Sequence, residues 1–245
     1  FKQAFDLLME NKLLSAISIA GTALAISVVM VIIILLYAKT ANYEPKMNRD
    51  CTLYVKWSSV YEKEDKDARN YSRLSLYDIQ QIFYPLTTAE AVSALCEYGR
   101  MLAVVPGGGE EINCQLLYTD ADFWKVFEFG FLAGQPYDEV AFKAGLKQAV
   151  ICESVARRLF GGVETAVGRH LELNFVEFTV CGVVRDVSKF AEQSYSEIWL
   201  PYTTNTDISR IDLSGWTKGH TGSFQCFILA RSSTGFPEIC ILYTS

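Results

Sequence analysis

Histidine is almost absent from this sequence, which has two in 245 residues, His170 and His220. Two imidazole rings cannot hold a metal ion unless carboxylates or thiolates join them, so no metal site is expected. We expect no organic cofactor either. Positive charge is also scarce: 22 lysines and arginines face 28 acidic residues, and the formal net charge is −6. Nucleic acid and anionic membrane surfaces both require basic patches, so the sequence argues against either as the main partner.

Catalytic motifs and paired cysteines are missing as well. The sequence has no G-x-S-x-G elbow, no H-E-x-x-H helix and no Walker motif. The run Gly107–Gly109 lacks the Lys-Ser/Thr of a phosphate loop, so we interpret it as a hairpin turn. Seven cysteines without C-x-x-C or regular spacing predict small core residues with at most one disulfide. We interpret Asp120 and Asp122 as helix-start residues and His220 as a solvated loop residue, so no catalytic residue is predicted.

Charge is missing altogether from residues 13–38, a stretch bounded by Lys12 and Lys39. As a helix it would be about 39 Å long, more than the roughly 30 Å hydrocarbon core of a bilayer. A secretory signal peptide has a shorter apolar region and a small-residue cleavage site, and a buried core helix would rarely stay uncharged over this length. The sequence therefore predicts a transmembrane helix at 13–38, followed by a large domain outside the bilayer.

The first twelve residues predict a second, shorter helix. In residues 1–12, helical spacing places apolar side chains on one face and charged side chains on the other. We expect this amphipathic helix to lie at the membrane surface. A short N-terminus inside and a large domain outside is the simplest topology, because long domains translocate largely regardless of flanking charge.

Small residues mark one side of the predicted transmembrane helix. Ser18, Gly21 and Ala25 follow one another at helical spacing. Such a stripe allows another helix to approach closely, although small residues are also common in membrane helices generally.

The remaining sequence alternates strand-like and helix-like segments, which predicts an α+β domain. Strands are expected at 51–59, 91–105, 111–119, 148–152, 169–174, 177–185, 197–200 and 223–230. Helices are expected at 75–84, 120–127 and 153–160, the first capped by Ser75 and the last closed by Gly161-Gly162. A second structural unit is expected to begin near residue 148, and the last strand to return to the first unit.

Three stretches resemble the MacB/FtsX-type ABC-transporter permeases with a periplasmic core domain. Residues 10–33 are similar to the family's first transmembrane helix, with its Asn-Lys entry and central glycine. Residues 118–137 resemble the family pattern in which Asp-Phe precedes a Leu-x-x-Gly-x-x-Phe/Tyr turn. Residues 149–202 are the most specific, with AVICESVARRLFGG, AVGRHLELN, FTVCGVVRDV and SEIWLPY in the family's order.

The resemblance implies a domain plan. An N-terminal transmembrane helix would precede an extracytoplasmic porter-like α/β subdomain, made of residues 39–147 and 205–245. A smaller α+β subdomain, residues 148–204, would be inserted between them. The family has three further transmembrane helices after this domain, so the chain is expected to be the N-terminal portion of a permease in the bacterial inner membrane, with its large domain in the periplasm.

The resemblance also implies a function, that of a non-catalytic subunit for export or efflux. Such permeases work as dimers in membrane lipid with a cytoplasmic ABC ATPase, in some cases with a periplasmic adaptor and an outer-membrane duct. The amphipathic helix would receive force from the ATPase through four residues: Phe1, Phe5, Leu8 and Lys12. The stripe Ser18, Gly21 and Ala25 would pack against a later helix or a second protomer.

Two other functions remain open at this point. A membrane-anchored sensor would have a cytoplasmic output domain after another helix, where the transporter has three hydrophobic segments. An anchored extracytoplasmic enzyme would need titratable side chains clustered in a pocket, and the sequence offers no such set. The exported substrate, whether peptide, macrolide, lipoprotein or another envelope component, is not indicated.

Overall fold

A computed structural model describes residues 12–40, 44–61, 69–211, 213, 219–232 and 235–241. The chain forms two compact units, Phe1–Ala41 and Asn42–Ser245. The predicted amphipathic helix at 1–12 lies outside the described residues except for Lys12.

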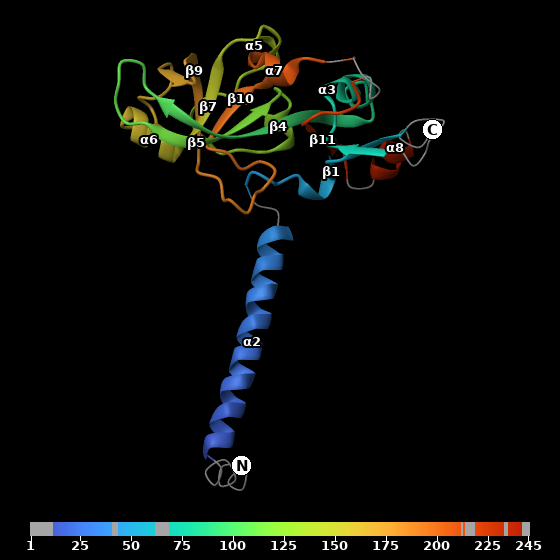
Figure 1. Cartoon of the computed structure of the whole chain (residues 1–245), viewed down its shortest axis with the longest axis vertical. Coiled ribbons are helices and arrows are strands. Elements are labelled where there is room, and N and C mark those ends of the chain that lie inside the picture. Colours follow the sequence, from blue (N-terminus) through green and yellow to red (C-terminus); the bar gives the residue numbers. More distant parts are fainter. Residues whose placement is uncertain are drawn as a thin grey trace. The chain divides into compact units, whose positions relative to one another are not determined.

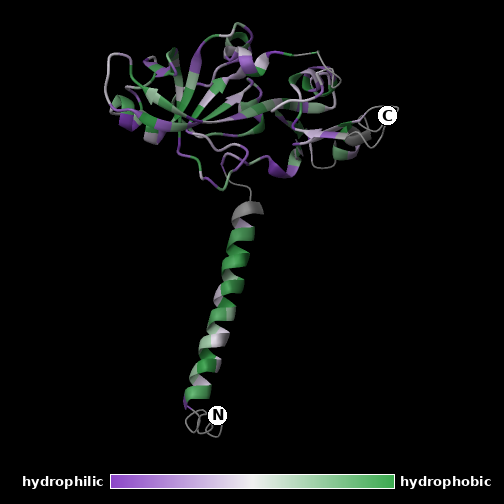
Figure 2. Cartoon of the chain, viewed as in Figure 1, coloured by the Kyte–Doolittle hydropathy of each residue, from purple (hydrophilic) through white to green (hydrophobic). Residues whose placement is uncertain are grey.

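The first unit contains one long helix, α2 (Lys12–Thr40). Residues 12–37 are long and apolar enough to span a membrane, and none of this segment is buried within the protein. Apolar residues follow one another along almost the whole helix and are not confined to one face (Figure 2). A helix that is apolar all round needs an apolar environment, which a bilayer supplies.

The second unit is built on a nine-stranded sheet, with strand order β1-β11-β4-β5-β10-β7-β9-β6 and with β8 pairing both β4 and β9 (Figure 1). The strands of this sheet are β1 (Thr52–Val55), β4 (Ala89–Val104), β5 (Ile112–Thr119), β6 (Phe131–Gly134), β7 (Gln148–Cys152), β8 (His170–Leu173), β9 (Val176–Val184), β10 (Ile198–Pro201) and β11 (Gln225–Ala230). A separate two-stranded sheet joins β2 (Ser58–Tyr61) to β3 (Arg69–Ser72).

Six of these strands close into a ring, β4-β5-β10-β7-β9-β8, because β8 hydrogen-bonds to β4 on one side and to β9 on the other. The long strand β4 makes closure possible. Its register against β5 shifts between Glu97 and Gly99, and Gly99 has φ +90°, a conformation that favours glycine. Before the bulge β4 pairs with β11, and after it with β8.

Short helices surround the sheet. They are α3 (Leu76–Asp78), the π-helix η2 (Ile79–Phe83), α4 (Phe123–Val126), α5 (Glu139–Lys143), α6 (Glu153–Phe160), α7 (Thr206–Ser209) and α8 (Phe236–Ile241), with 3₁₀ turns η1 (Arg49–Cys51) and η3 (Tyr202–Thr204). Figure 1 shows α6 beside the β4–β5 hairpin at one end of the sheet, and α3 and α8 toward the other end. Arg158 of α6 pairs with Glu110 of that hairpin.

The core combines buried strand residues with a group of aromatic rings. Trp199 of β10 is fully buried and lies 5.2 Å from Phe129 and 6.3 Å from Trp124, measured between ring centroids. The rings of Phe123 and Phe127 lie 4.9 Å apart between centroids, and Phe127 in turn contacts Phe227 of β11. Large aromatic surfaces buried in contact account for much of the stability of such a core.

Most sequence-predicted elements are confirmed. The hairpin turn at 106–109 joins antiparallel β4 and β5, and the predicted helix 153–160 ends at Gly161 with φ +75°. The predicted strand 51–59 is interrupted and forms β1 and β2. The α+β class is confirmed, whereas the subdomain boundaries near 148 and 205 stay a prediction, because one hydrogen-bonded sheet contains strands from both proposed parts.

Candidate functional site

The apolar helix α2 is the first functional element. Its hydroxyl groups bond within the helix: Thr22 Oγ1 donates to the carbonyl oxygens of Ser18 and Ile19 at 3.0 Å, and Ser27 Oγ donates to Ala23 O at 2.8 Å. Hydroxyls satisfied in this way add little cost in a bilayer, where no water replaces a missing bond. The polar residues of this helix are therefore compatible with a membrane-spanning role.

The predicted small-residue stripe is exposed on this helix. Ser18, Gly21 and Ala25 all face away from the helix axis into open space, and a Cβ added to Gly21 would meet no atom within 4 Å. Among the residues that the structure describes, none requires glycine at position 21. The proposed contact with another helix stays a prediction.

The segment that follows the helix is hydrogen-bonded to the rest of the domain. Lys46 is buried, and its Nζ donates to Gln193 Oε1 at 2.6 Å. Glu128 N donates to Pro45 O at 3.0 Å, and Asn48 Nδ2 donates to Glu128 Oε1 at 3.1 Å. We call these contacts the linker clamp.

The linker clamp reaches two loops that meet at the edge of the sheet. One loop precedes β6 and contains Glu128 and Gly130; a Cβ on Gly130 would lie 3.0 Å from Glu44 Oε2. The other loop follows β9, and its Arg185 lies 3.8 Å from the same Glu44 oxygen. Since β6 and β9 pair directly, the segment after the helix is attached to one end of a single strand pair.

Burial sets the electrostatics of the linker clamp. It lowers the pKa of Lys46 to about 8, with the nearby Arg49 acting in the same direction. A buried ammonium needs a hydrogen-bond acceptor, which Gln193 supplies. The sequence analysis used Lys46 only as a flanking charge, and nothing in a single lysine after an apolar run signals that it is buried.

A buried carboxylate lies elsewhere in the domain. Asp120 accepts hydrogen bonds from Ala94 N at 2.6 Å, Ser93 Oγ at 2.8 Å, Tyr84 Oη at 2.8 Å and Phe123 N at 3.0 Å. The predicted helix 120–127 is shorter in the structure: α4 begins at Phe123, with Asp122 at its N-cap position, and Asp120 supports this start by accepting from Phe123 N. The other three partners are Tyr84, directly after η2, and Ser93 and Ala94 of β4, so Asp120 also connects separate elements.

The environment of Asp120 disfavours its charge. Burial raises the pKa of this carboxyl to about 7, although its hydrogen bonds from Ala94, Ser93 and Tyr84 act in the opposite direction. Burial, and after it the charge of the nearby Asp120, raises the pKa of Tyr84. The hydroxyl oxygens of Tyr84 and Tyr202 lie 3.1 Å apart. A cleft of about 420 Å³ is lined by all three side chains.

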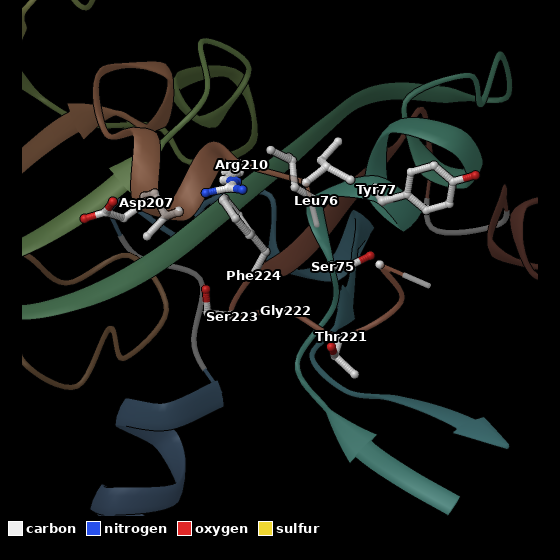
Figure 3. A pocket seen from close by; sticks show the side chains of 12 residues that line it. Ser75, Leu76, Tyr77, Asp207, Arg210, Thr221, Gly222, Ser223 and Phe224 are labelled. Atoms are coloured by element: carbon white, nitrogen blue, oxygen red, sulfur yellow. The ribbon is translucent and has the colours of Figure 1, made fainter. Parts of the chain in front are cut away.

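A second cleft, of about 290 Å³, lies between α3, the end of α7 and residues 219–224 (Figure 3). Arg210 and Asp207 face it from one side, and Ser75 to Tyr77 from the other. Beside it, His220 Nδ1 lies 2.6 Å from Asp78 Oδ1, so this histidine has a carboxylate partner, in contrast to the solvated residue expected from the sequence. No nucleophile–base pair is formed by the residues described around this cleft.

Reactive thiols and metal ligands are not features of the described part of the chain. Six cysteines there are free, and burial raises the pKa of Cys114 and Cys181 to about 12 and that of Cys152 to about 11. Such thiols are protonated at neutral pH and unreactive. No group of three or more histidine, cysteine or acidic side chains among the described residues could hold a metal ion.

The comparison with known families gives a match along most of the chain. The family described as "MacB-like periplasmic core domain" matches residues 15–235. The macrolide export ATP-binding/permease protein MacB of Burkholderia cenocepacia (strain HI2424) is 35% identical over 75 residues, 30% of this chain and 11% of that protein. MacB 1 of Aeromonas hydrophila subsp. hydrophila is 27% identical over 125 residues, 47% of this chain and 19% of that protein. The chain therefore spans a small part of these relatives.

Solved structures share the fold. The periplasmic region of MacB from Actinobacillus actinomycetemcomitans superposes with a TM-score of 0.55 at 18% identity, covering 79% of this chain and 83% of that one. The extracellular domain of the noncanonic ABC-type transporter YknZ from Gram-positive bacteria gives 0.54 at 16% identity, covering 76% and 88%. With an apolar helix before this fold and a family match over residues 15–235, the chain belongs to the MacB-like periplasmic core domain family of ABC-transporter permeases.

Proposed function

We propose that this chain is the N-terminal portion of an ABC-transporter permease in the bacterial cytoplasmic membrane, with its large domain in the periplasm. It couples ATP hydrolysis by a cytoplasmic ABC ATPase to movement of that domain, for export or efflux. The ATPase is a partner chain or, as in the relatives named ATP-binding/permease, a further part of the same protein. Two permease protomers form the working unit.

The linker clamp carries this proposal. Three residues, 41–43, lie between the end of α2 and Glu44, so the helix is joined to the domain by a very short connection. The contacts of Pro45, Lys46 and Asn48 hold the end of this connection against the loops around β6 and β9. A displacement of the helix along or across the membrane would therefore reach one defined strand pair, as a mechanical coupling requires.

Two sets of residues have proposed roles in the membrane region. Phe1, Phe5, Leu8 and Lys12 form the surface that contacts the ATPase. The stripe Ser18, Gly21 and Ala25 packs against a later transmembrane helix or the second protomer, because its open surface allows close backbone approach. A periplasmic adaptor and an outer-membrane duct complete the route in some systems of this family.

Purification of tagged full-length protein in mild detergent tests the proposal. We expect an ATPase with a Walker motif to co-purify with it, or ATPase activity to reside on the same chain. Changing Phe5 and Leu8 to Asp should release a separate ATPase, or uncouple a fused one, because both substitutions place charge on the apolar face. Gln3→Asp, which adds one negative charge on the opposite face of the predicted helix, is the matched control for each single substitution and should retain coupling.

Recovery of a kinase or another signalling partner, with no ATPase in either form, would contradict the proposal. That outcome would favour a membrane-anchored sensor with an extracytoplasmic ligand-binding domain.

A further inference from the structure

The hairpin between β8 and β9 has an unusual turn. Asn174 and Phe175 have φ values of +47° and +64°, the two left-handed residues of a type I′ turn. Asparagine suits the first position, but the second strongly favours glycine, because a side chain there is strained. Phe175 occupies that position with 91% of its surface exposed. Neither backbone conformation nor burial explains a phenylalanine at this site.

The same hairpin carries a second unfavourable feature. Glu172 and Glu177 lie directly opposite each other in the antiparallel register. Like charges in this arrangement repel and destabilise a strand pair. Among the ion pairs of the described residues, neither glutamate has a basic partner within 4 Å, and the same holds for the neighbouring Glu111.

A cleft of about 530 Å³ lies beside this hairpin. Met101, Leu102 and Val104 of β4 and Phe175 of the turn supply its apolar walls, and Leu102 is 54% exposed. Glu111 and Glu172 stand at its rim. Arg100 also lines the cleft, but its guanidinium lies 3.3 Å from Glu197 and donates to Asn113 O, so its charge is already paired.

From this combination we infer that the cleft beside the β8–β9 hairpin binds a cationic peptide through one or two apolar side chains. The apolar walls receive the side chains, and the unpaired glutamates at the rim receive lysine or arginine groups. The negative charge of the rim disfavours an anionic ligand or an anionic membrane surface. A volume of this size is within the range of ligand pockets.

The dimensions favour a peptide over a folded protein. A stable protein–protein interface buries roughly 800 Å² on each partner and contains a broad apolar centre. Here four apolar side chains surround one concave site, enough to anchor a short segment. This inference goes beyond the proposed function, since binding requires neither ATP nor the ATPase, and it can hold or fail independently of coupling.

Binding can be measured with a defined probe. Full-length protein in phosphatidylcholine nanodiscs is titrated against a fluorescent seven-residue peptide in which lysine alternates with leucine or phenylalanine. A second peptide replaces every lysine with glutamate, and a third replaces the apolar residues with serine. Empty nanodiscs give the lipid background. We expect saturable binding of the first peptide only, weakened by about tenfold or more as salt is raised to screen the rim charges.

Two variants separate binding from folding. Phe175→Gly relieves the strained turn, so it should fold at least as well as the wild-type protein, yet it should weaken peptide binding by about tenfold, as expected for loss of a central aromatic anchor. Glu111→Gln with Glu172→Gln removes both rim charges, and with them the repulsion between Glu172 and Glu177, and should weaken binding similarly. Val140→Ser and Glu164→Gln, both at exposed positions of other elements, are matched controls and should bind normally.

Three results would overturn the inference. They are equal binding of the lysine and glutamate peptides, unchanged binding by Phe175→Gly, and no saturable binding of the lysine peptide. In the last case, loss of a protein dimer in Phe175→Gly would assign the surface to a second copy of the chain instead.

Discussion

Replacing Asp120 with asparagine should change how the stability of the domain depends on pH. A carboxyl group whose pKa is about 7 in the folded state has a value of about 3.9 when unfolded. Between these values the folded protein binds a proton that the unfolded chain does not, so the free energy of unfolding falls as pH rises through this window. From pH 5 to pH 8 this single group removes about 2–3 kcal/mol of stability, at about 1.4 kcal/mol per pKa unit.

The hydrogen-bond geometry also predicts that the substitution itself lowers the stability of the domain, which opposes the gain from removing the titrating carboxyl group. In protonated Asp120, Oδ2 can donate its hydrogen to Tyr84 Oη and still accept from Ala94 N. The amide nitrogen of asparagine at that position cannot accept, which leaves the Ala94 N–H unpaired at a cost of about 1–3 kcal/mol. Asp120→Asn should therefore be less stable than the wild-type protein at pH 5, and the difference should shrink or reverse by pH 8.

Thermal unfolding of both proteins in nanodiscs at pH 5, 6, 7 and 8 measures this difference. The fluorescence of Trp124 and Trp199, which lie in the aromatic core, reports unfolding of the domain. Because both proteins share every other titrating group, the difference between their curves isolates Asp120. Parallel pH profiles of wild type and variant would refute the protonation of Asp120 near neutrality.

Three further predictions follow from single residues. In the wild-type protein, thermal stability should rise between about pH 8 and 10, because burial lowers the pKa of Lys46 in the folded state and only the unfolded chain keeps the proton in this range. Lys46→Met should abolish this rise. An unchanged pH profile would contradict burial of the ammonium group. Gly134→Ala should lower the free energy of unfolding, measured with denaturant, by at least about 2 kcal/mol, because its Cβ would collide with the carbonyl oxygen of Cys181. Gly161 has a similar φ but open space around it, so Gly161→Ala should lower this free energy by only about 1 kcal/mol. Equal losses would refute the close approach at Gly134. Gly21→Ile should reduce protomer or helix association measured by cross-linking in membranes without changing insertion, and unchanged association would remove the proposed stripe.

Local signals in the sequence predicted much of this fold. The glycines at 107–109 and 161 mark a hairpin and a helix end, and both occur where expected. Closure of the ring was not predictable, because the pairing of Ala103 with Leu173 joins distant segments and leaves no periodic signal. Asp120 illustrates the same limit. Its bond to Phe123 N is local and was expected, whereas its bonds to Tyr84 and Ser93 depend on the tertiary structure.

Some functional elements could also be predicted from the sequence, whereas others depend on the tertiary structure. An uncharged stretch as long as residues 13–38 is visible in any sequence, since hydropathy alone identifies it. The linker clamp is not, because Lys46 and Gln193 are polar residues of ordinary appearance that meet only in the folded domain. The strands at 169–174 and 177–185 on either side of Phe175 were expected, but the exposure and strain of Phe175 required the structure.

Hydrogen–deuterium exchange on the full-length transporter with its ATPase tests the central claim most directly. Exchange is compared between an ATP-bound, hydrolysis-blocked state and the ADP state. If the helix drives the domain through the linker clamp, protection of residues 128–130 and 185–193 should differ between the states, and Lys46→Met should reduce the difference while ATP binding persists. Identical exchange of these two loops in both states, with a bound and active ATPase, would contradict the account.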